Sequence, residues 1–407
     1  MIAKKLARIS VTSALLLCAF ASSATTYTYR LPVRGLVANG EAGGGGAATP
    51  PVDPTWTQVL MAGNTVSDAL MVIAADGGVW SKGYNGFGQL GNGTTTTVAT
   101  WTKVENNAVR MQQDRLRSAI IKADGSLWVT GNNGNGELGL NDTTNRTVFT
   151  QVPGMSNVAK VTHGDSTMFV LKTDGTLWSS GNNYYSQRGV PGAGGANSRV
   201  FVQHTSLPLP AGVRVVDIEH QGASYTSMIL DSEGNVWGAG YDNDGTLGMG
   251  PTQTYAAYTK IPYFSNNATA IAMGNDFSAV LTNDGVVHTT GRNGSSQLGR
   301  GSRSNSYTAF APAVSNVVSM VAGRNSLVVR KSDGSIWSTN YSTENQGNMF
   351  GQPPGFFQWS NATNVTSFGV GASYFWMVKN DGSLWMPEVY FNGSGTWGLK
   401  QYKFQLP

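Results

Sequence analysis

A short pattern that recurs seven times constrains the fold of this chain more than any other feature. In each copy an apolar segment leads to an acidic residue and Gly, and Trp follows three residues after the Gly, except where His288 replaces it. Successive copies lie 48 to 59 residues apart, a period typical of architectures whose units pack on one another. The turn residues are Asp76-Gly77, Asp124-Gly125, Asp174-Gly175, Glu233-Gly234, Asp284-Gly285, Asp333-Gly334 and Asp381-Gly382.

Each repeat carries the signals for about four short β-strands. Asp-Gly between two apolar segments predicts a hairpin with a type I′ turn, because Gly readily adopts positive φ. A glycine-rich segment follows the Trp, as in Gly131-Asn-Asn-Gly-Asn-Gly-Glu-Leu-Gly139, and a further strand such as Phe149-Thr-Gln-Val152 comes after it. The repeat is therefore expected to be a small antiparallel sheet.

Apolar residues fall on both faces of the expected sheets. Val79 and Trp80 are neighbours, so their side chains point to opposite faces. A sheet with two apolar faces needs a neighbour on each side, which a closed ring provides. We therefore predict an all-β fold, a seven-bladed β-propeller over residues 55–407 with about 50 residues and four antiparallel strands per blade. Trp56-Thr-Gln-Val59 resembles the last strand of a repeat, which favours a final blade completed by strands from both chain ends.

The recurring Trp is interpreted as a core residue and not as a ligand-stacking residue. A residue that appears once per repeat has a packing role that repeats, and a buried indole removes a large apolar area from water. The predicted repeat core consists of Trp80, Trp128, Trp178, Trp237, Trp337 and Trp385.

The first residues have the composition of an export signal. Lys4, Lys5 and Arg8 precede an apolar stretch, and Ser22-Ser23-Ala24 supplies small residues for cleavage, so residues 1–24 are predicted to be a signal peptide. Residues 25–54, rich in Gly and Pro, are predicted to be a linker. Three of the 27 basic residues lie in the signal, which leaves 24 against 23 acidic residues. The expected location is therefore the periplasm, the cell surface or the medium, and nucleic acid is not an expected partner.

The repeat resembles that of the regulator-of-chromosome-condensation family. The resemblance rests on the apolar strand, the Asp-Gly turn, the Trp and the Gly-x-Asn-x-x-Gly-Gln-Leu-Gly segment, and it extends over residues 55–407. It implies a seven-bladed propeller, and exported bacterial members of the family imply a protein-binding role. The family usually has His three residues after the glycine that opens the second strand. The corresponding residues here are Thr167, Tyr225, Phe277, Ser326 and Tyr374, so the residues of a nucleotide-exchange site have no match.

Catalytic and metal-binding patterns are not found in the sequence. Gly134-x-Gly136-x-x-Gly139 matches a dinucleotide fingerprint, but no helical pattern follows it. The four histidines stand far apart and the one cysteine, Cys18, lies in the predicted signal. Asp242-Asn-Asp-Gly245 is oxygen-rich but lacks the spacing of a calcium loop. We therefore expect no catalytic residues, no metal and no cofactor.

Aromatic residues in loops are the candidate binding residues. Tyr225, Phe277 and Tyr374 are interpreted as equivalent repeat positions that face one mouth of the ring, with Phe375 beside the last. Tyr184 and Tyr185 interrupt the glycine-rich segment of the third repeat. Such residues are typical of protein hot spots and of sugar sites, or they fill the ring interior.

Three functions follow as hypotheses. The first is an exported, non-enzymatic propeller that binds a macromolecular partner, expected to be a protein, through loops at one end. The second is an extracellular carbohydrate-binding or polysaccharide-active propeller. The third is a delivered effector with guanine-nucleotide exchange activity on a small GTPase. No transmembrane segment is expected after removal of the signal.

Overall fold

The computed structural model describes most of the repeat region. The described residues are 56–61, 69–74, 76–164, 166–191, 195–220, 225–303, 306–339, 355–359, 362–370, 375–381, 383–388 and 398–402. The predicted signal peptide (1–24) and linker (25–54) lie outside them.

The described residues form seven four-stranded antiparallel sheets, each built from four consecutive strands. The first three sheets contain β1 (Trp56–Met61), β2 (Leu70–Ala74), β3 (Val79–Gly83) and β4 (Val98–Glu105); β5 (Ala108–Gln113), β6 (Arg117–Lys122), β7 (Leu127–Gly131) and β8 (Arg146–Gln151); and β9 (Val158–His163), β10 (Thr167–Lys172), β11 (Leu177–Gly181) and β12 (Ser198–Gln203). The fourth and fifth contain β13 (Val215–Glu219), β14 (Thr226–Asp231), β15 (Val236–Asp242) and β16 (Gln253–Lys260); and β17 (Ala268–Met273), β18 (Phe277–Thr282), β19 (Val287–Arg292) and β20 (Ser306–Val314). The last two contain β21 (Val317–Ala322), β22 (Leu327–Lys331), β23 (Ile336–Ser338) and β24 (Phe357–Gln358); and β25 (Val365–Val370), β26 (Phe375–Lys379), β27 (Leu384–Glu388) and β28 (Gly398–Tyr402).

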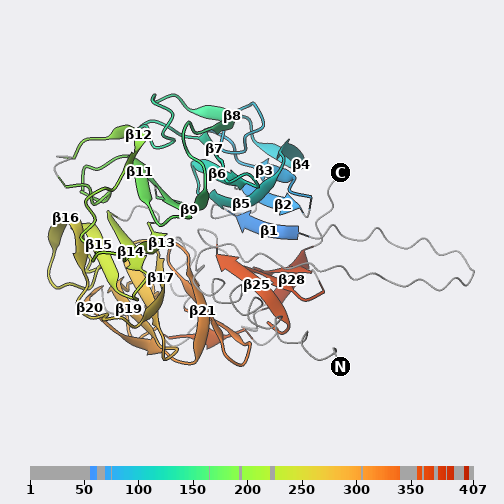
Figure 1. The fold of residues 1–407 in the computed structure, drawn as a ribbon. Coiled ribbons are helices and arrows are strands. Elements are labelled where there is room, and N and C mark those ends of the chain that lie inside the picture. Colours follow the sequence, from blue (N-terminus) through green and yellow to red (C-terminus); the bar gives the residue numbers. More distant parts are fainter. Residues whose placement is uncertain are drawn as a thin grey trace, which may run out of the picture.

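The sheets are arranged around a common centre, with the first strand of each sheet toward the middle (Figure 1). β1 contacts β25, so the first sheet lies beside the last. The prediction of an all-β fold with four antiparallel strands per repeat is confirmed. Among the described residues no helix reaches the length and apolar character that crossing a bilayer would require.

The predicted completion of the last sheet by strands from both chain ends is wrong. β1 pairs with β2, and Trp56 lies opposite Ala74 as Ala108 lies opposite Lys122 in the second sheet. β1 is therefore the first strand of the first sheet. Its sequence resembles that of an outer strand, but pairing follows chain order in the first and last sheets alike.

The Asp-Gly turns differ from the predicted type I′ hairpin. In the second sheet Lys122 N donates to the Ser126 carbonyl at 3.0 Å, and Gly125 N donates to the Lys122 carbonyl at 2.9 Å. Three residues thus form the loop, and only Gly125 has a positive φ, of 79°. This is a type I turn followed by a glycine bulge. Asp124 Oδ1 accepts a bond from Ser126 N at 2.9 Å, which explains the acid before the glycine.

The repeated tryptophans pack on the sheets, and five of the six are only partly buried. Trp128 Nε1 donates to Ser126 Oγ at 3.0 Å, Ser126 Oγ donates to Asp124 Oδ1, and Lys122 Nζ lies 3.7 Å from the Trp128 ring centroid. The same combination of Lys, Asp, Ser or Thr and Trp recurs at Trp178, Trp337 and Trp385. Trp237 is the buried member, and its Nε1 donates to Asp231 instead. Trp80 is partly buried and lies under Lys103.

Neighbouring sheets bury their apolar faces against one another. Leu127 and Val129 of the second sheet share one buried cluster with Met168 and Val170 of the third. Burial on both sides of a sheet is the reason that a repeat of this composition is stable only between two others.

The glycine-rich segments join each sheet to the outer strand of the next. Gly139 has a φ of 70°, and a Cβ there would lie 2.4 Å from the Phe201 ring of β12. Two residues later Asn141 N donates to the Arg199 carbonyl at 2.8 Å. The same glycine faces an aromatic ring of the next outer strand at three other places, namely Gly91 with Phe149, Gly189 with Tyr258 and Gly248 with Phe310. Gly299 faces Phe356, which directly precedes β24.

Candidate functional site

Four tyrosines from the third and fourth sheets gather at the end where the glycine-rich segments lie. We call Tyr184, Tyr185, Tyr225 and Tyr241 the tyrosine cluster. The ring centroids of Tyr185 and Tyr225 are 4.0 Å apart, and those of Tyr185 and Tyr241 are 5.8 Å apart at an angle of 21°. Tyr184 meets Tyr185 edge to face at 4.9 Å and 82°.

The repeat geometry fixes the backbone of this cluster. Tyr241 N donates to the Tyr225 carbonyl at 2.9 Å, which ties β15 to the segment before β14. Tyr184 N donates to Asn182 Oδ1 at 2.6 Å, and Tyr185 N donates to Gln187 Oε1 at 3.0 Å. The two adjacent tyrosines therefore sit on a loop whose amide groups are already satisfied.

The cluster presents one ring to solvent on a packed base. Tyr184 is 72% exposed, whereas Tyr185, Tyr225 and Tyr241 are partly buried. Because Tyr185 is held between two rings, the ring that it supports loses little conformational freedom when a partner covers it. A rigid, exposed aromatic side chain over a packed base is the arrangement that binding hot spots use.

The structure brings together three of the predicted binding residues and separates the others. Tyr184, Tyr185 and Tyr225 are in the cluster. Phe277 is fully buried, in an apolar cluster between the fifth and sixth sheets. Tyr374 lies outside the described residues. Phe375 begins β26 and pairs with Val370.

The predicted equivalence of Tyr225 and Phe277 is wrong by one position. Phe277 pairs with Gly291, and the residue that pairs with the corresponding Gly240 is Thr226. More residues separate β13 from β14 than β17 from β18. The residue three positions after Gly222 therefore lies one residue before the strand position that Phe277 holds in the fifth sheet. Tyr225 instead takes the place of Asp276, whose carbonyl accepts from Arg292 N.

Tyr241 was not singled out from the sequence. It follows the opening glycine of its segment as Tyr84 does in the first repeat, so it looked like an ordinary repeat residue. Its nearness to Tyr185 across two sheets has no local signal in the sequence.

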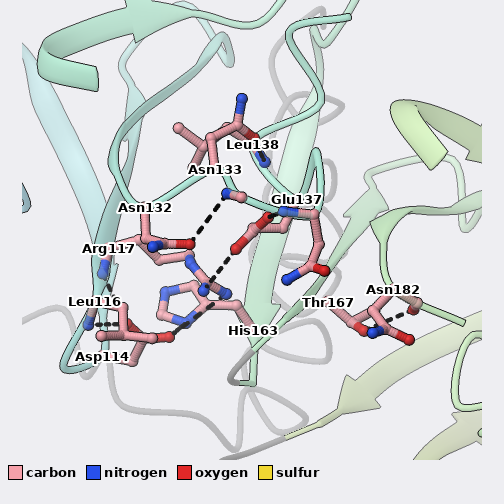
Figure 2. A network of polar contacts seen from close by, with 12 residues as sticks. Asp114, Leu116, Arg117, Asn132, Asn133, Glu137, Leu138, His163, Thr167 and Asn182 are labelled. Atoms are coloured by element: carbon pink, nitrogen blue, oxygen red, sulfur yellow. Dashed lines mark hydrogen bonds and ion pairs between the residues drawn. The ribbon is translucent and has the colours of Figure 1, made fainter. Parts of the chain in front are cut away.

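A second group of polar side chains, also not predicted, lies buried between the second and third sheets (Figure 2). Arg117 Nη2 donates to Glu137 Oε1 at 2.9 Å, and Arg117 Nη1 donates to the Gly164 carbonyl of the third sheet at 2.7 Å. Asp114 Oδ2 lies 3.8 Å from Arg117 Nη1 and 2.9 Å from His163 Nδ1. We call Asp114, Arg117, Glu137 and His163 the buried charge network.

The two carboxyl groups of the network differ in their affinity for protons. Burial raises the pKa of Glu137, and Arg117 opposes that rise. Burial also opposes ionisation of Asp114, but the charges of Arg117 and His163 outweigh it and lower its pKa to about 2. The side chains of Arg117 and Glu137 are 0% exposed, whereas that of Asp114 is 23% exposed. The network therefore joins two sheets, and its central ion pair offers no surface to a partner.

An acidic pair occurs on the inner strand of the fourth sheet. Asp217 and Glu219 both contact Lys160 Nζ from the third sheet, at 2.9 Å for Glu219. Both carboxylates are almost fully buried. The one positive charge of Lys160 is shared by both carboxylates, and a pair held by a buried lysine is unlike the pair that flanks the scissile bond of a glycoside. The described residues hold no group of three or more His, Cys, Asp or Glu side chains placed to bind a metal ion.

Comparison with known proteins finds similar repeats. Residues 124–171 and residues 268–297 each match the regulator of chromosome condensation (RCC1) repeat. Protein RCC2 of Mus musculus and that of Homo sapiens are each 27% identical to this chain over 132 residues. Each match covers 31% of this chain and 25% of the relative, so this chain matches about a quarter of the length of these relatives.

Solved structures with a similar fold are β-propellers of the same kind. Yeast RCC1 (Prp20), solved with Kap60, is 16% identical with a TM-score of 0.65, and 79% of each chain is covered. Human WBSCR16 is 17% identical with a TM-score of 0.63, over 81% of this chain and 94% of the other. At these identities the likeness shows a shared fold. Together with the two repeat matches and the RCC2 relatives, it shows that this chain is similar to proteins built from RCC1 repeats.

Proposed function

We propose that this chain is an exported, non-enzymatic, seven-bladed propeller that binds a protein partner through the tyrosine cluster. The observation that carries the proposal is the exposed Tyr184 ring, supported edge to face by Tyr185, which packs at 4.0 Å on Tyr225. Export is supported by the composition of residues 1–24. Seven sheets in the described residues support the number of blades.

The size of the expected effect follows from the exposure of the ring. Truncation of a central aromatic hot-spot residue costs about 2 kcal/mol or more, which is about a 30-fold loss of affinity. Tyr184→Ala is therefore expected to weaken capture of the partner by at least that factor. The fold should be unaffected, since a ring that is 72% exposed contributes little to the core.

The test compares Tyr184→Ala with Tyr84→Ala on immobilised protein. Tyr84 follows the opening glycine of the first repeat and is 39% exposed, outside the cluster. Proteins from the exported fraction of the source cells are captured, identified by mass spectrometry and titrated individually. The proposal requires a protein that wild type and Tyr84→Ala bind equally and that Tyr184→Ala binds at least 30-fold more weakly. Equal binding by all three variants rejects the tyrosine cluster as the surface.

Two other functions have supporting observations and separate tests. Tyrosine rings also bind sugars, and retention of glycans on an array, lost in Tyr184→Ala, would favour a carbohydrate ligand. A structure of Prp20p from Saccharomyces cerevisiae is described together with its binding to Gsp1p and histones, which motivates an assay of nucleotide release from a panel of small GTPases. Accelerated release by the wild type would favour an exchange factor.

A further inference from the structure

The glycine-rich segments share one polar contact, made by the residue two after the opening glycine. In the first, second and fifth sheets this residue is Asn85, Asn133 or Asn293. Its Oδ1 accepts from the backbone N five residues later, at 2.9, 2.9 and 3.1 Å. Its Nδ2 donates to the carbonyl nine residues later, at 2.8, 3.0 and 2.8 Å. One amide thus closes the segment from both sides.

The fourth sheet has an acid at this position. Asp242 Oδ1 accepts from Leu247 N at 3.1 Å, as the asparagines do. Asp242 Oδ2 is buried and has no hydrogen-bond partner among the described residues. It corresponds to the amide nitrogen, which donates in the first, second and fifth sheets. An acceptor has replaced a donor at a position that is 0% exposed.

The end of the segment is attached to the next sheet as in the other repeats. Gly250 N donates to the Thr308 carbonyl at 3.1 Å, as Asn141 N does to Arg199. Counting nine residues from Asp242, as in the other sheets, gives the carbonyl of Pro251. Asp242 is 0% exposed, and an ionised carboxylate that faces a carbonyl away from water is unfavourable. A protonated carboxyl group can instead donate to that carbonyl.

We propose that Asp242 is a proton-operated latch: its protonated carboxyl group closes the segment between β15 and β16, and loss of the proton releases it. The closed form has the hydrogen bonds of the asparagine-containing sheets, with the carboxyl O–H in place of the amide N–H. The ligand of this site is a single proton.

The electrostatic surroundings favour the protonated form. Burial raises the pKa of Asp242 to about 6, the negative charge of Asp244 adds to the rise, and backbone bonds from Leu247 and Thr246 oppose it. Asp276 of the fifth sheet, paired with Arg292 at 3.6 Å, interacts with Asp244. The strands packed beside the segment carry three phenols, those of Tyr255 and Tyr258 on β16 and of Tyr307 on β20, and one amine, that of Lys260 at the end of β16.

The sign of the pH effect follows from linkage. A carboxyl group with a raised pKa in the folded state binds more protons there than in the unfolded chain, so its stabilising contribution is present below pH 4 and is lost as the pH rises through about 6. A difference of two pKa units corresponds to about a 100-fold change in the ratio of folded to unfolded protein. Burial also raises the pKa of Asp217, so the contribution of Asp242 to the pH dependence must be isolated by substitution.

The test measures urea unfolding from pH 4 to pH 8 for wild type, Asp242→Asn and Asn133→Asp. Asp242→Asn restores the amide. The change in its ratio of folded to unfolded protein between pH 4 and pH 8 should be about 100-fold smaller than that of the wild type. Asn133→Asp installs the acid in the second sheet and should gain a similar dependence. Equal pH dependence of wild type and Asp242→Asn overturns the proposal. Stabilisation of the wild type by added Ca²⁺ at pH 8, absent in Asp242→Asn, also overturns it and assigns a metal site instead.

A local measurement separates the latch from global stability. The amide of Leu247 should exchange its hydrogen at least 10-fold faster at pH 8 than at pH 5, after correction for intrinsic exchange. In Asp242→Asn the corrected rates should agree within a factor of two. Equal corrected rates in the wild type at the two pH values would overturn the proposal even if the unfolding data agreed with it.

The latch also bears on the tyrosine cluster, because Tyr241 directly precedes Asp242. This consequence rests on the proposed function. If it holds, wild type binds its partner more tightly at pH 5.5 than at pH 7.5, and Asp242→Asn binds equally at both. Binding that is independent of pH in the wild type removes the coupling alone, since unfolding and exchange test the latch without a partner.

Discussion

Replacement of Arg117 by Met should destabilise the protein strongly. The Arg117 side chain is 0% exposed and makes bonds of 2.9 Å to Glu137 and 2.7 Å to the Gly164 carbonyl. Its removal leaves Glu137 buried without a cation and takes one positive charge from beside Asp114. Breaking a buried ion pair by removing one partner costs about 3–5 kcal/mol. We expect a loss in the upper half of that range, because a second carboxylate and a carbonyl also lose a favourable contact.

A double-mutant cycle isolates the interaction between Arg117 and Glu137. Glu137→Gln installs the residue that Gln89, Gln187 and Gln297 show at the same repeat position. Alone it should cost less than Arg117→Met, about 1–3 kcal/mol, because Asp114 still faces the guanidinium group. The double variant has no uncompensated charge at either position. Its loss should be smaller than the sum of the single losses by about 2 kcal/mol.

The assay is equilibrium unfolding in urea at pH 7, followed by tryptophan fluorescence, with the slope checked for two-state behaviour. Arg146→Met is the matched control, because its ion pair with Asp142 has side-chain exposures of 21% and 41% and should contribute about 0–1 kcal/mol. A loss below about 1 kcal/mol for Arg117→Met, or strictly additive losses in the cycle, would refute the reasoning.

Three further outcomes follow from the structure. Gly139→Ala and Gly154→Ala both place a Cβ at positive φ, at a cost of about 1–2 kcal/mol. Only the first meets a ring, so its melting temperature should fall further, and equal shifts would contradict the proposed contact with Phe201. Lys331→Met removes a cation 4.1 Å from the indole of its own repeat and should cost about 0.5–1 kcal/mol in the same urea assay. Asp114→Asn should reduce the loss of stability as the pH falls from about 4 to about 2, because in that range Asp114 is ionised in the folded state and protonated in the unfolded chain. An unchanged pH dependence of unfolding in that range would show that Asp114 does not stabilise the fold in this way.

The sequence was sufficient to predict the sheets because their signals are local. Asp124-Gly125 and its copies mark the hairpins, and short apolar segments on either side of each turn mark the strands. The turn type was predicted wrongly because the same dipeptide also ends a three-residue loop, in which Asp124 accepts from Ser126. In this loop only Gly125 has a positive φ, whereas a type I′ turn needs it at both central residues.

The candidate site was predicted only in part because it depends on register between sheets. Tyr184 and Tyr185 stood out since they interrupt a repeated segment. Phe277 was expected beside Tyr225 because both were counted from a glycine, and the longer segment before β14 shifts that count.

The buried charge network had a sequence signal that comparison between repeats would have revealed. Arg117 and Glu137 are charged at positions where other repeats have Thr167 or Phe277 and Gln89 or Gln187. Two opposite charges at normally uncharged positions of one repeat indicate a pair, although they lie 20 residues apart.

The contact between each glycine-rich segment and the next outer strand separates what the scaffold needs from what a ligand meets. The scaffold uses the asparagine, the glutamine and the glycines of the segment, together with one ring on the adjoining strand. The two residues in the middle, which are Tyr184 and Tyr185 in the third repeat, contribute backbone amides to this scaffold, whereas their side chains take no part in it. The side chains at these positions can therefore change without a change in the contacts of the scaffold, and several independent recognition surfaces can arise on one unchanged frame.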